Sequence, residues 1–417
     1  MVSPRNGQQR DVSDWSSLAE LRFIAASDLD RKESIQTEFD FAEAKFLERH
    51  ATCPHRAVIR AEKEAELLAA WEQVDGTILR APWRAGKTEL VFAAIDHANL
   101  FDRFLFINSQ EAPYPALRWR SSEEFRKIYG AREAVDHVAA LQERLGENVS
   151  RSEIAARLDT HIGRGGNPFS FVARERRERQ LPPVLVALDE IADYAYDPAH
   201  LAYIASLARI EHVRLCLIVQ RAPTIEPRYD NAFPDFRSIY LSPLTLGESA
   251  QLVQAKAKGC GISLSVHAIV EIHRAAGGRP LEVSALVDVC RQAKEDGKHG
   301  GHYGRADIDK LVRGKVVPLT TTPLEPLIVN HIRVYERGIT VLEQALIDRL
   351  LRCPWGESIT AETGPIVEGL ARYGLVALSN DRVYLNGALF RDVVLKRMTD
   401  YRTHNYWQPG EYGNDYV

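Results

Sequence analysis

The sequence has few residues that could cross-link the chain and no segment that could span a membrane. Its five cysteines are odd in number and scattered along 417 residues, which argues against a disulfide framework. No apolar run approaches the ~18 residues that a membrane helix needs, and the start, MVSPRNGQQRDVSDW, lacks the apolar centre of a signal peptide. We therefore expect a cytoplasmic protein that makes no membrane contact.

Neither sign of charge is in excess. The 53 Lys and Arg residues nearly balance the 57 Asp and Glu residues, so that the formal net charge is −4. This balance argues against a surface coated in positive charge for nucleic acid, although a local basic patch is still open. A content of 45% hydrophobic and 26% charged residues is that of a globular protein, and this length predicts two or three domains.

The middle of the chain contains five short apolar runs, at residues 76–82, 103–109, 184–190, 213–219 and 237–241. Helical stretches separate them, and near-continuous apolar strands that alternate with helices are typical of a parallel sheet covered on both faces. The predicted fold class is therefore α/β. The expected parts are a polar arm (1–55), an α/β core (56–243) with an insertion at 110–180, a helical lid (244–335), a final domain (336–400) and an aromatic polar tail (401–417).

The segment APWRAGKT lies between the first apolar run and a helix, and it predicts a phosphate-binding loop (P-loop). Backbone N–H groups at the helix start would hold phosphate oxygens, Lys87 would bridge them, and the Thr88 hydroxyl would contact Mg²⁺. Ala81 replaces the first glycine of the pattern, which is tolerable because Pro82 keeps residue 81 extended. A chance Gly-Lys-Thr at a helix start is the alternative. The predicted nucleotide-binding residues here are Ala81, Pro82, Trp83, Arg84, Ala85, Gly86, Lys87, Thr88 and Glu89.

Polar side chains follow two later apolar runs. The run VLVALDE ends in Asp189 and Glu190, at the end of a parallel strand where ligands bind. We expect Asp189 to hold Mg²⁺ and Glu190 to polarise the attacking water. Gln220 ends the next strand and is a candidate sensor of the γ-phosphate or of the water. A polar strand end without a catalytic role is the alternative for each.

The order of these signals over residues 56–398 resembles an AAA+ ATPase, of the class that places the acidic pair on the strand beside the P-loop strand. The resemblance rests on the P-loop, the Leu-Asp-Glu strand end, the polar residue on the following strand and the segment YLSPLTLGES, which is similar to the entry into the helical lid of these proteins. It implies ATP and Mg²⁺ as cofactors and a homo-oligomer that forms when ATP binds.

The segment AAGGRPLEV resembles the Gly-x-Pro segment of the STAND and origin-recognition branches, where a lid helix begins near the nucleotide. This resemblance makes Arg279 a candidate γ-phosphate sensor and Pro280 a candidate contact to the base. A helix stop followed by a helix start is the plain structural alternative. An arginine finger from a neighbouring subunit would be Arg228 or Arg237, although a surface or packing role fits both.

The final domain resembles the winged helix that ends such ATPases. Its sequence predicts a helix at 339–352, a second helix at 361–373, two strands joined by the turn Ser-Asn-Asp, and another helix. The second helix carries Glu362 and Glu368 against the single cation Arg372, whereas a DNA-reading helix is expected to carry several basic or amide residues. This composition favours a clamp or a protein contact over DNA.

Three further features are not expected to take part in catalysis. His50, Cys53 and His55 offer three metal ligands without a complementary pair, which argues against a zinc site. The run RERRER at 174–179 is typical of a solvated helix face, with phosphate contact as the alternative. The aromatic tail fits a disordered terminus or a set of anchors for a partner surface.

Together these signals predict an AAA+ or STAND-type molecular switch that binds and hydrolyses ATP. Its nucleotide state would control assembly or the binding of a protein partner or effector on a separate chain. The alternatives are a DNA-binding AAA+ ATPase, such as a loader or a transposition-type regulator, and a non-hydrolysing scaffold stabilised by nucleotide.

Overall fold

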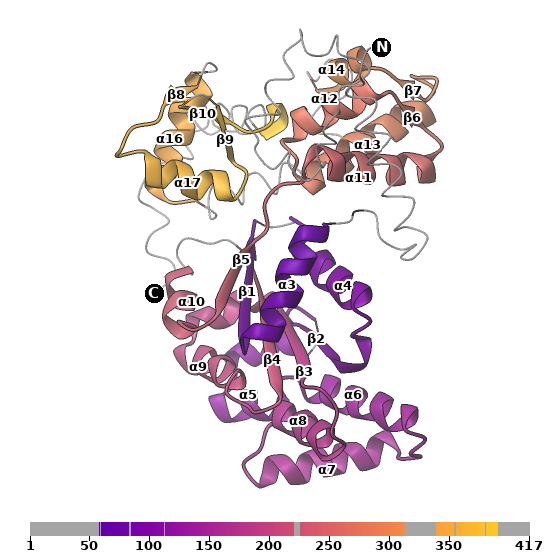
Figure 1. Cartoon of the computed structure of the whole chain (residues 1–417), viewed down its shortest axis with the longest axis vertical. Coiled ribbons are helices and arrows are strands. Elements are labelled where there is room, and N and C mark those ends of the chain that lie inside the picture. The colour runs from indigo at the N-terminus through magenta and orange to yellow at the C-terminus, as the bar shows by residue number, and fades with distance from the viewer. Residues whose placement is uncertain are drawn as a thin grey trace, which may run out of the picture. The chain divides into compact units, whose positions relative to one another are not determined.

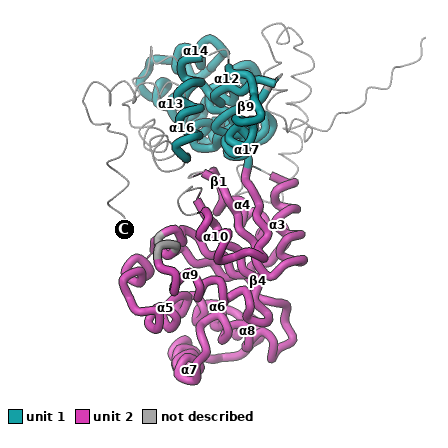
Figure 2. Tube along the Cα trace, turned by 90° about the vertical axis from the view of Figure 1, so that its left-hand side faces the viewer, with its two compact units in different colours: residues 1–59, 242–417 teal, residues 60–241 magenta. Residues whose placement is uncertain are grey.

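The computed structural model describes residues 60–312 and 339–390 together with residue 58, apart from residues 83–84, 112, 221–225, 354–355 and 380. The chain divides into two compact units: residues 60–241, called here the core unit, and residues 1–59 with 242–417, called the C-terminal unit (Figure 2). The predicted arm and tail, with His50, Cys53 and His55, lie outside the described residues. No described helix has the length and apolar character of a membrane span.

The core unit is built on one sheet of five parallel strands (Figure 1). The strands are β1 (Gly76–Ala81), β2 (Phe104–Asn108), β3 (Val184–Asp189), β4 (Val213–Gln220) and β5 (Arg237–Tyr240). Each strand corresponds to one of the five apolar runs, so the prediction of a parallel α/β sheet is confirmed.

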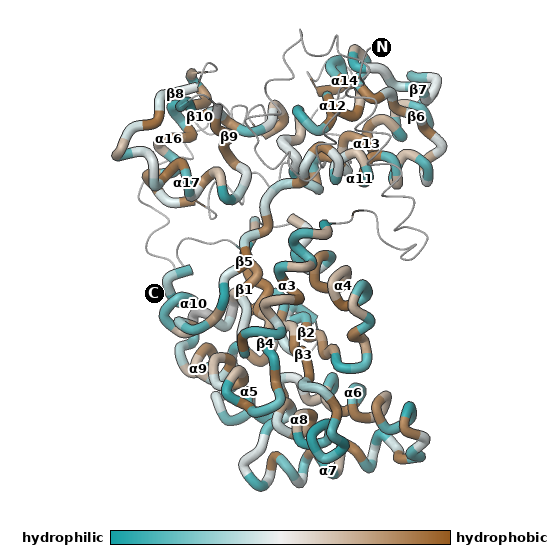
Figure 3. The backbone as a smooth tube through the Cα atoms, in the orientation of Figure 1, coloured by the Kyte–Doolittle hydropathy of each residue, from teal (hydrophilic) through white to brown (hydrophobic). Residues whose placement is uncertain are grey.

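Helices cover both faces of this sheet, and much of it is accordingly brown in Figure 3. Successive residues of a strand point to opposite faces. On β1, Ile78 packs in one apolar cluster with Tyr229, whereas Leu79 packs in another with Leu90. The first face is covered by α9 (Pro198–Leu207), α10 (Glu226–Ala232) and the insertion, and the second by α3 (Ala61–Gln73) and α4 (Lys87–His97).

The strand order is β2-β3-β4-β1-β5, which corrects one expectation. The strand that ends in Asp189 is not beside the P-loop strand, because β4 lies between them and pairs with both. The order of strands along a chain does not determine their order in space, so the sequence pattern could not show this. As a consequence, Gln220 rather than Asp189 is in register with Ala81.

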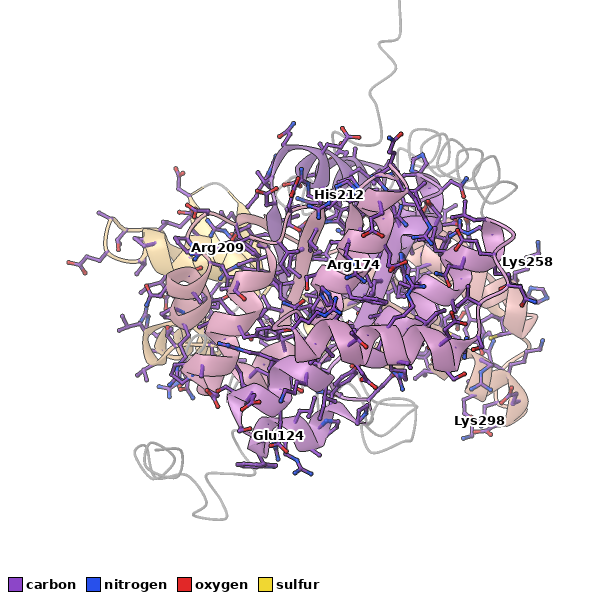
Figure 4. The ribbon with its side chains drawn as sticks, turned by 90° about the horizontal axis from the view of Figure 1, so that it is seen from below. Glu124, Arg174, Arg209, His212, Lys258 and Lys298 are labelled. Carbon is purple, nitrogen blue, oxygen red and sulfur yellow. The ribbon has the colours of Figure 1, made fainter. Side chains whose placement is uncertain are left out.

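The insertion between β2 and β3 is mainly helical. Its elements are η4 (Tyr114–Trp119), α5 (Ser122–Ile128), α6 (Ala131–Arg144), α7 (Arg151–Gly163) and α8 (Pro168–Glu178), of which α8 carries the Arg174 labelled in Figure 4. Ser121, Ser150 and Asn167 cap α5, α7 and α8 by accepting a backbone N–H of the first turn. Phe125 and Phe169 pack in the same apolar cluster as Ile78, which fixes the insertion to the sheet.

The charged run 174–179 is not a solvated helix face throughout. Arg176 is fully buried, and its Nε and Nη1 donate to the carbonyl oxygens of Pro182 and Asp102, both at 2.8 Å. Glu175 is also fully buried and accepts a hydrogen bond from Arg179 at 2.9 Å. The expectation of a solvated face is wrong for Arg176 and Glu175, because both side chains are buried and joined to neighbouring segments.

The C-terminal unit contains a helical region, residues 246–312. It contains α11 (Leu246–Cys260), β6 (Ser263–Leu264), α12 (Val266–Ala276), α13 (Pro280–Glu295), β7 (His302–Tyr303) and α14 (Arg305–Val312). Thr245 and Ser265 cap α11 and α12. Val253, Ile272 and Val287 share one buried apolar cluster, so these helices form a core of their own.

The described residues 339–390 form the second part of this unit, called here the terminal domain. It contains α16 (Val341–Arg352), β8 (Glu357–Ser358), α17 (Gly364–Arg372), β9 (Val376–Ser379) and β10 (Arg382–Leu385). The strands form an antiparallel sheet in the order β8-β10-β9, of which the two-residue β8 was not expected. Because α17 begins at Gly364, Glu362 precedes it, and Glu368 pairs with Arg372 at 2.8 Å.

Substitution of Arg176 tests how firmly α8 is fixed. Arg176→Met should lower the free energy of unfolding by about 2–4 kcal/mol, because a fully buried side chain loses its charge-assisted hydrogen bonds to the carbonyl oxygens of Pro182 and Asp102. The matched control is Arg177→Met, which removes an exposed ion pair with Glu211 and should cost less than about 0.5 kcal/mol. Urea unfolding of the full chain measures both, and equal effects would contradict the buried role.

Candidate nucleotide-binding site

The predicted P-loop joins β1 to α4 at the carboxyl edge of the sheet. Ala81 is the last, buried residue of β1, and Lys87 is the first residue of α4. Gly86 precedes the helix with φ of +86°, a left-handed conformation that a residue with a Cβ adopts only with strain. The other predicted loop residues are Pro82 and Ala85, which are half-buried, Glu89, which is exposed, and Trp83 and Arg84, which lie outside the described residues.

Lys87 folds back onto its own loop. Its Nζ donates to the carbonyl oxygens of Pro82 at 2.9 Å and of Ala81 at 3.3 Å. Burial lowers the pKa of Lys87 from 10.5 to about 8, although the charges of Asp189 and Glu190 act to raise it. An ammonium group whose charged form is destabilised in this way is stabilised when an anion binds beside it.

Thr88 and Asp189 join the P-loop to the end of β3. The Thr88 hydroxyl donates to Asp189 Oδ2 at 2.5 Å across 101 residues of sequence. The second carboxylate oxygen of Asp189 accepts the backbone N–H of Glu190 at 2.8 Å, and the residue is 6% exposed. A hydroxyl and a carboxylate this close offer the hard oxygen ligands that Mg²⁺ prefers.

Glu190 has an unusual backbone and a partner that the sequence did not reveal. Its φ of 56° and ψ of 39° are left-handed, a conformation that is costly for a residue with a side chain and that is found often at functional sites. The Gln110 amide donates to Glu190 Oε2 at 3.3 Å. Gln110 follows β2 in a polar turn, where no spacing or motif distinguished it.

Gln220 ends β4 directly beside the P-loop strand. It is half-buried and in register with Ala81. Asp189, at the end of β3, is in register with Ile218 on β4 and with Asn108 on β2. Because every strand runs in the same direction, all of these strand ends lie at one edge of the sheet.

A buried arginine immediately before the P-loop was missed by the sequence analysis. Arg80 is 2% exposed on β1, where the run GTILRAP had indicated only an apolar strand. It forms an ion pair with Asp230, and its Nη1 lies 4.0 Å from Glu226 Oε1. Both carboxylates belong to α10, so this cluster joins the strand that leads into the P-loop to the helix that carries Arg228.

The other candidate residues have different surroundings. Pro280 is the first residue of α13 in the C-terminal unit, and Arg279 precedes it. Arg228 is exposed on α10. Arg237 begins β5, at the amino edge of the sheet, and donates to Gln73 Oε1 at 3.2 Å. The nucleotide contact of Arg279 and Pro280 and the finger role of Arg228 or Arg237 stay predictions.

The strand order and the position of these groups define the fold of the core unit. Five parallel strands in the order β2-β3-β4-β1-β5, with a Gly-Lys-Thr loop after β1 and an acidic residue at the end of β3, are the arrangement of a P-loop AAA+ core. The predicted AAA+ fold is therefore confirmed by the topology of this chain.

No protein family and no curated protein matches the sequence. Solved structures similar to the chain include a Walker-type ATPase of Pyrococcus abyssi, at 14% identity and a TM-score of 0.44, with 81% of this chain and 96% of that chain covered. The RuvB Holliday junction branch migration motor of Thermotoga maritima has 12% identity, a TM-score of 0.38 and coverage of 84% and 96%. Cdc6p of Pyrobaculum aerophilum has 15% identity, a TM-score of 0.39 and the same coverage.

The lowered pKa of Lys87 predicts a pH dependence of MgATP binding. Below pH 8 the ammonium group is already charged and affinity should be nearly constant, whereas above pH 8 a proton must be taken up and the Kd should rise by up to about tenfold per pH unit. In Lys87→Arg, whose guanidinium stays charged, the Kd should not change between pH 7.5 and 9. Calorimetric titration at several pH values measures this, and equal slopes for both proteins would contradict it.

Proposed function

We propose that the chain binds ATP with Mg²⁺ at the loop that ends in Gly86, Lys87 and Thr88 and at Asp189. The observation that carries this proposal is the 2.5 Å hydrogen bond between Thr88 and Asp189. The Asp189 carboxylate is also close enough to Lys87 for its charge to oppose the lowering of the lysine pKa by burial. A hydroxyl, a carboxylate, a cation and a helix N-terminus gathered at one sheet edge suit a metal-bound polyphosphate.

Each group would have its own part in hydrolysis. Lys87 and the first N–H groups of α4 would hold phosphate oxygens, and Thr88 with Asp189 would hold Mg²⁺, which supplies neutralising charge at the phosphates when bound. Glu190 would accept a proton from the attacking water. Gln220, beside Ala81 on the neighbouring strand, would orient that water or the γ-phosphate.

We further propose that the nucleotide state acts as a switch for a cytoplasmic assembly. Its output would be a homo-oligomer or the binding of a protein partner or effector on a separate chain, with the terminal domain acting as a winged helix. A protein partner is favoured over DNA because Arg372 on α17 is already paired with Glu368, at 2.8 Å. In that state it is a poor contact for phosphate.

Removal of the P-loop lysine tests nucleotide binding. Lys87→Ala should weaken MgATP binding by about 10- to 100-fold, because charge-assisted hydrogen bonds to the phosphates are lost. Lys127→Ala removes an exposed lysine paired with Glu123 and should bind as the wild type does. Fluorescence titration with a labelled ATP analogue measures both, and unchanged binding by Lys87→Ala would refute the P-loop assignment.

Removal of the proposed general base separates hydrolysis from binding. Glu190→Gln should lower steady-state ATP turnover by about 10²- to 10⁴-fold while the Kd for MgATP stays within about twofold. Glu123→Gln changes an exposed carboxylate and is the matched control. Phosphate release by the purified chain measures turnover. A wild type no faster than Glu190→Gln would favour the non-hydrolysing scaffold.

A further inference from the structure

A buried polar junction joins the helical region to the terminal domain within the C-terminal unit. Arg279, at the turn between α12 and α13, is 8% exposed. Its Nε donates to Glu282 Oε1 at 2.7 Å, and its Nη1 donates to the carbonyl oxygens of Asn386 at 2.8 Å and Gly374 at 3.3 Å. The guanidinium also lies 5.1 Å from the centre of the Phe390 ring. Its partners therefore come from both parts.

Asn386 makes the reciprocal connection from the terminal domain. It is 6% exposed, and its Nδ2 donates to the carbonyl oxygens of Gly277 and Gly374, both at 2.9 Å. Its backbone N–H donates to Leu375 at 3.0 Å, which holds it inside the terminal domain. Each part thus contributes one buried polar side chain that donates hydrogen bonds to backbone carbonyl oxygens of the other part.

Gly387 shows how closely the two backbones approach. Its φ is +89°, and a Cβ at this position would lie 2.9 Å from Arg279 Nη2 and 3.0 Å from the carbonyl oxygen of Ala275. A side chain here would meet both strain and a clash with the helical region. The neighbouring Leu389 is 1% exposed and belongs to the apolar cluster of the helical region.

These contacts hold together for physical reasons. A buried guanidinium is costly unless its donors find acceptors. Here Nε donates to Glu282, which is fully buried, and Nη1 donates to two carbonyl oxygens, whereas Nη2 has no hydrogen-bond acceptor among the described residues. Separation of the two parts would leave Arg279 without its two carbonyl acceptors and Asn386 without Gly277 at the same time. The pair of Arg279 with Glu282 lies within the helical region and would remain. The junction should therefore be either fully formed or fully broken.

We infer that Arg279 is a positioning residue that, with Asn386, fixes the terminal domain to the helical region, so that both move as one body when nucleotide binds. The inference rests on the proposed function for its nucleotide step. It gives Arg279 a role other than the predicted γ-phosphate sensor. It also gives the switch a mechanical output, because a movement of α12 and α13 would carry the terminal domain with it.

Hydrogen–deuterium exchange on the full chain, with and without AMP-PNP and Mg²⁺, tests the inference. Arg279→Met and Asn386→Ala should both speed exchange of residues 374–387 about tenfold. Arg291→Met is the matched control, since Arg291 lies on α13 in a partly exposed pair with Glu295, and it should leave that exchange unchanged. Nucleotide should slow exchange in both parts of the wild type, but only in the helical region of Asn386→Ala.

Several results would overturn the inference. In one such result, Arg279→Met no longer binds AMP-PNP, while Asn386→Ala has the exchange rates and the AMP-PNP affinity of the wild type. Arg279 would then be a nucleotide sensor. Another is a wild type in which AMP-PNP binds but changes exchange in the helical region alone. If the wild type does not bind AMP-PNP, the proposed function fails, whereas faster exchange in both variants would still support the junction. Arg279→Lys, which keeps the charge, replaces Arg279→Met if the latter does not fold.

Discussion

The candidate site depends on one geometric constraint, which is that parallel strands all end at the same edge of their sheet. Residues far apart in the sequence therefore lie close together at that edge, although no sequence motif spans both of them. The hydrogen bond from Thr88 to Asp189 is the direct result: the two residues are 101 positions apart in the sequence, and their side-chain oxygens lie 2.5 Å apart. Lys87, Gln220 and the Gln110–Glu190 pair lie at strand ends or helix starts along that edge, so a change in strand order would separate them.

Much of the core could be predicted from the sequence, because the signals that mattered were local. Apolar runs such as GTILRAP and VLVALDE report burial on both faces of a strand, and the Gly-Lys-Thr segment reports a helix start suited to phosphate. Thr245, which caps α11, lies in the segment YLSPLTLGES that indicated the entry into the helical lid. Each of these signals needs only a window of a few residues.

What the sequence could not show depends on partners distant in the chain. The position of β4 between β1 and β3 is a property of pairing across the sheet, which no local pattern contains. Arg80 is buried because α10 supplies its partner, and Arg176 is buried because residues 102 and 182 supply its acceptors. In the sequence, neither arginine can be distinguished from one at the surface. Gln110 can be assigned to the site only once the fold places it beside Glu190. The same holds for Arg279, whose neighbours from residues 374–390 lie about a hundred positions further along.

The strand order also has a consequence for how the chain is made. Of the five strands of this sheet, β1 is synthesised first, but its neighbours in the sheet are β4 and β5, and 138 residues separate Thr77 from Leu215 on β4. A nascent chain therefore carries an apolar strand with both edges unpaired until residue 220 has been added, and with one edge unpaired until residue 240 has been added. Such a sheet has high contact order, which slows folding, and open strand edges invite pairing with other chains. The strand that leads into the P-loop is thus the part of the core that most needs protection during synthesis.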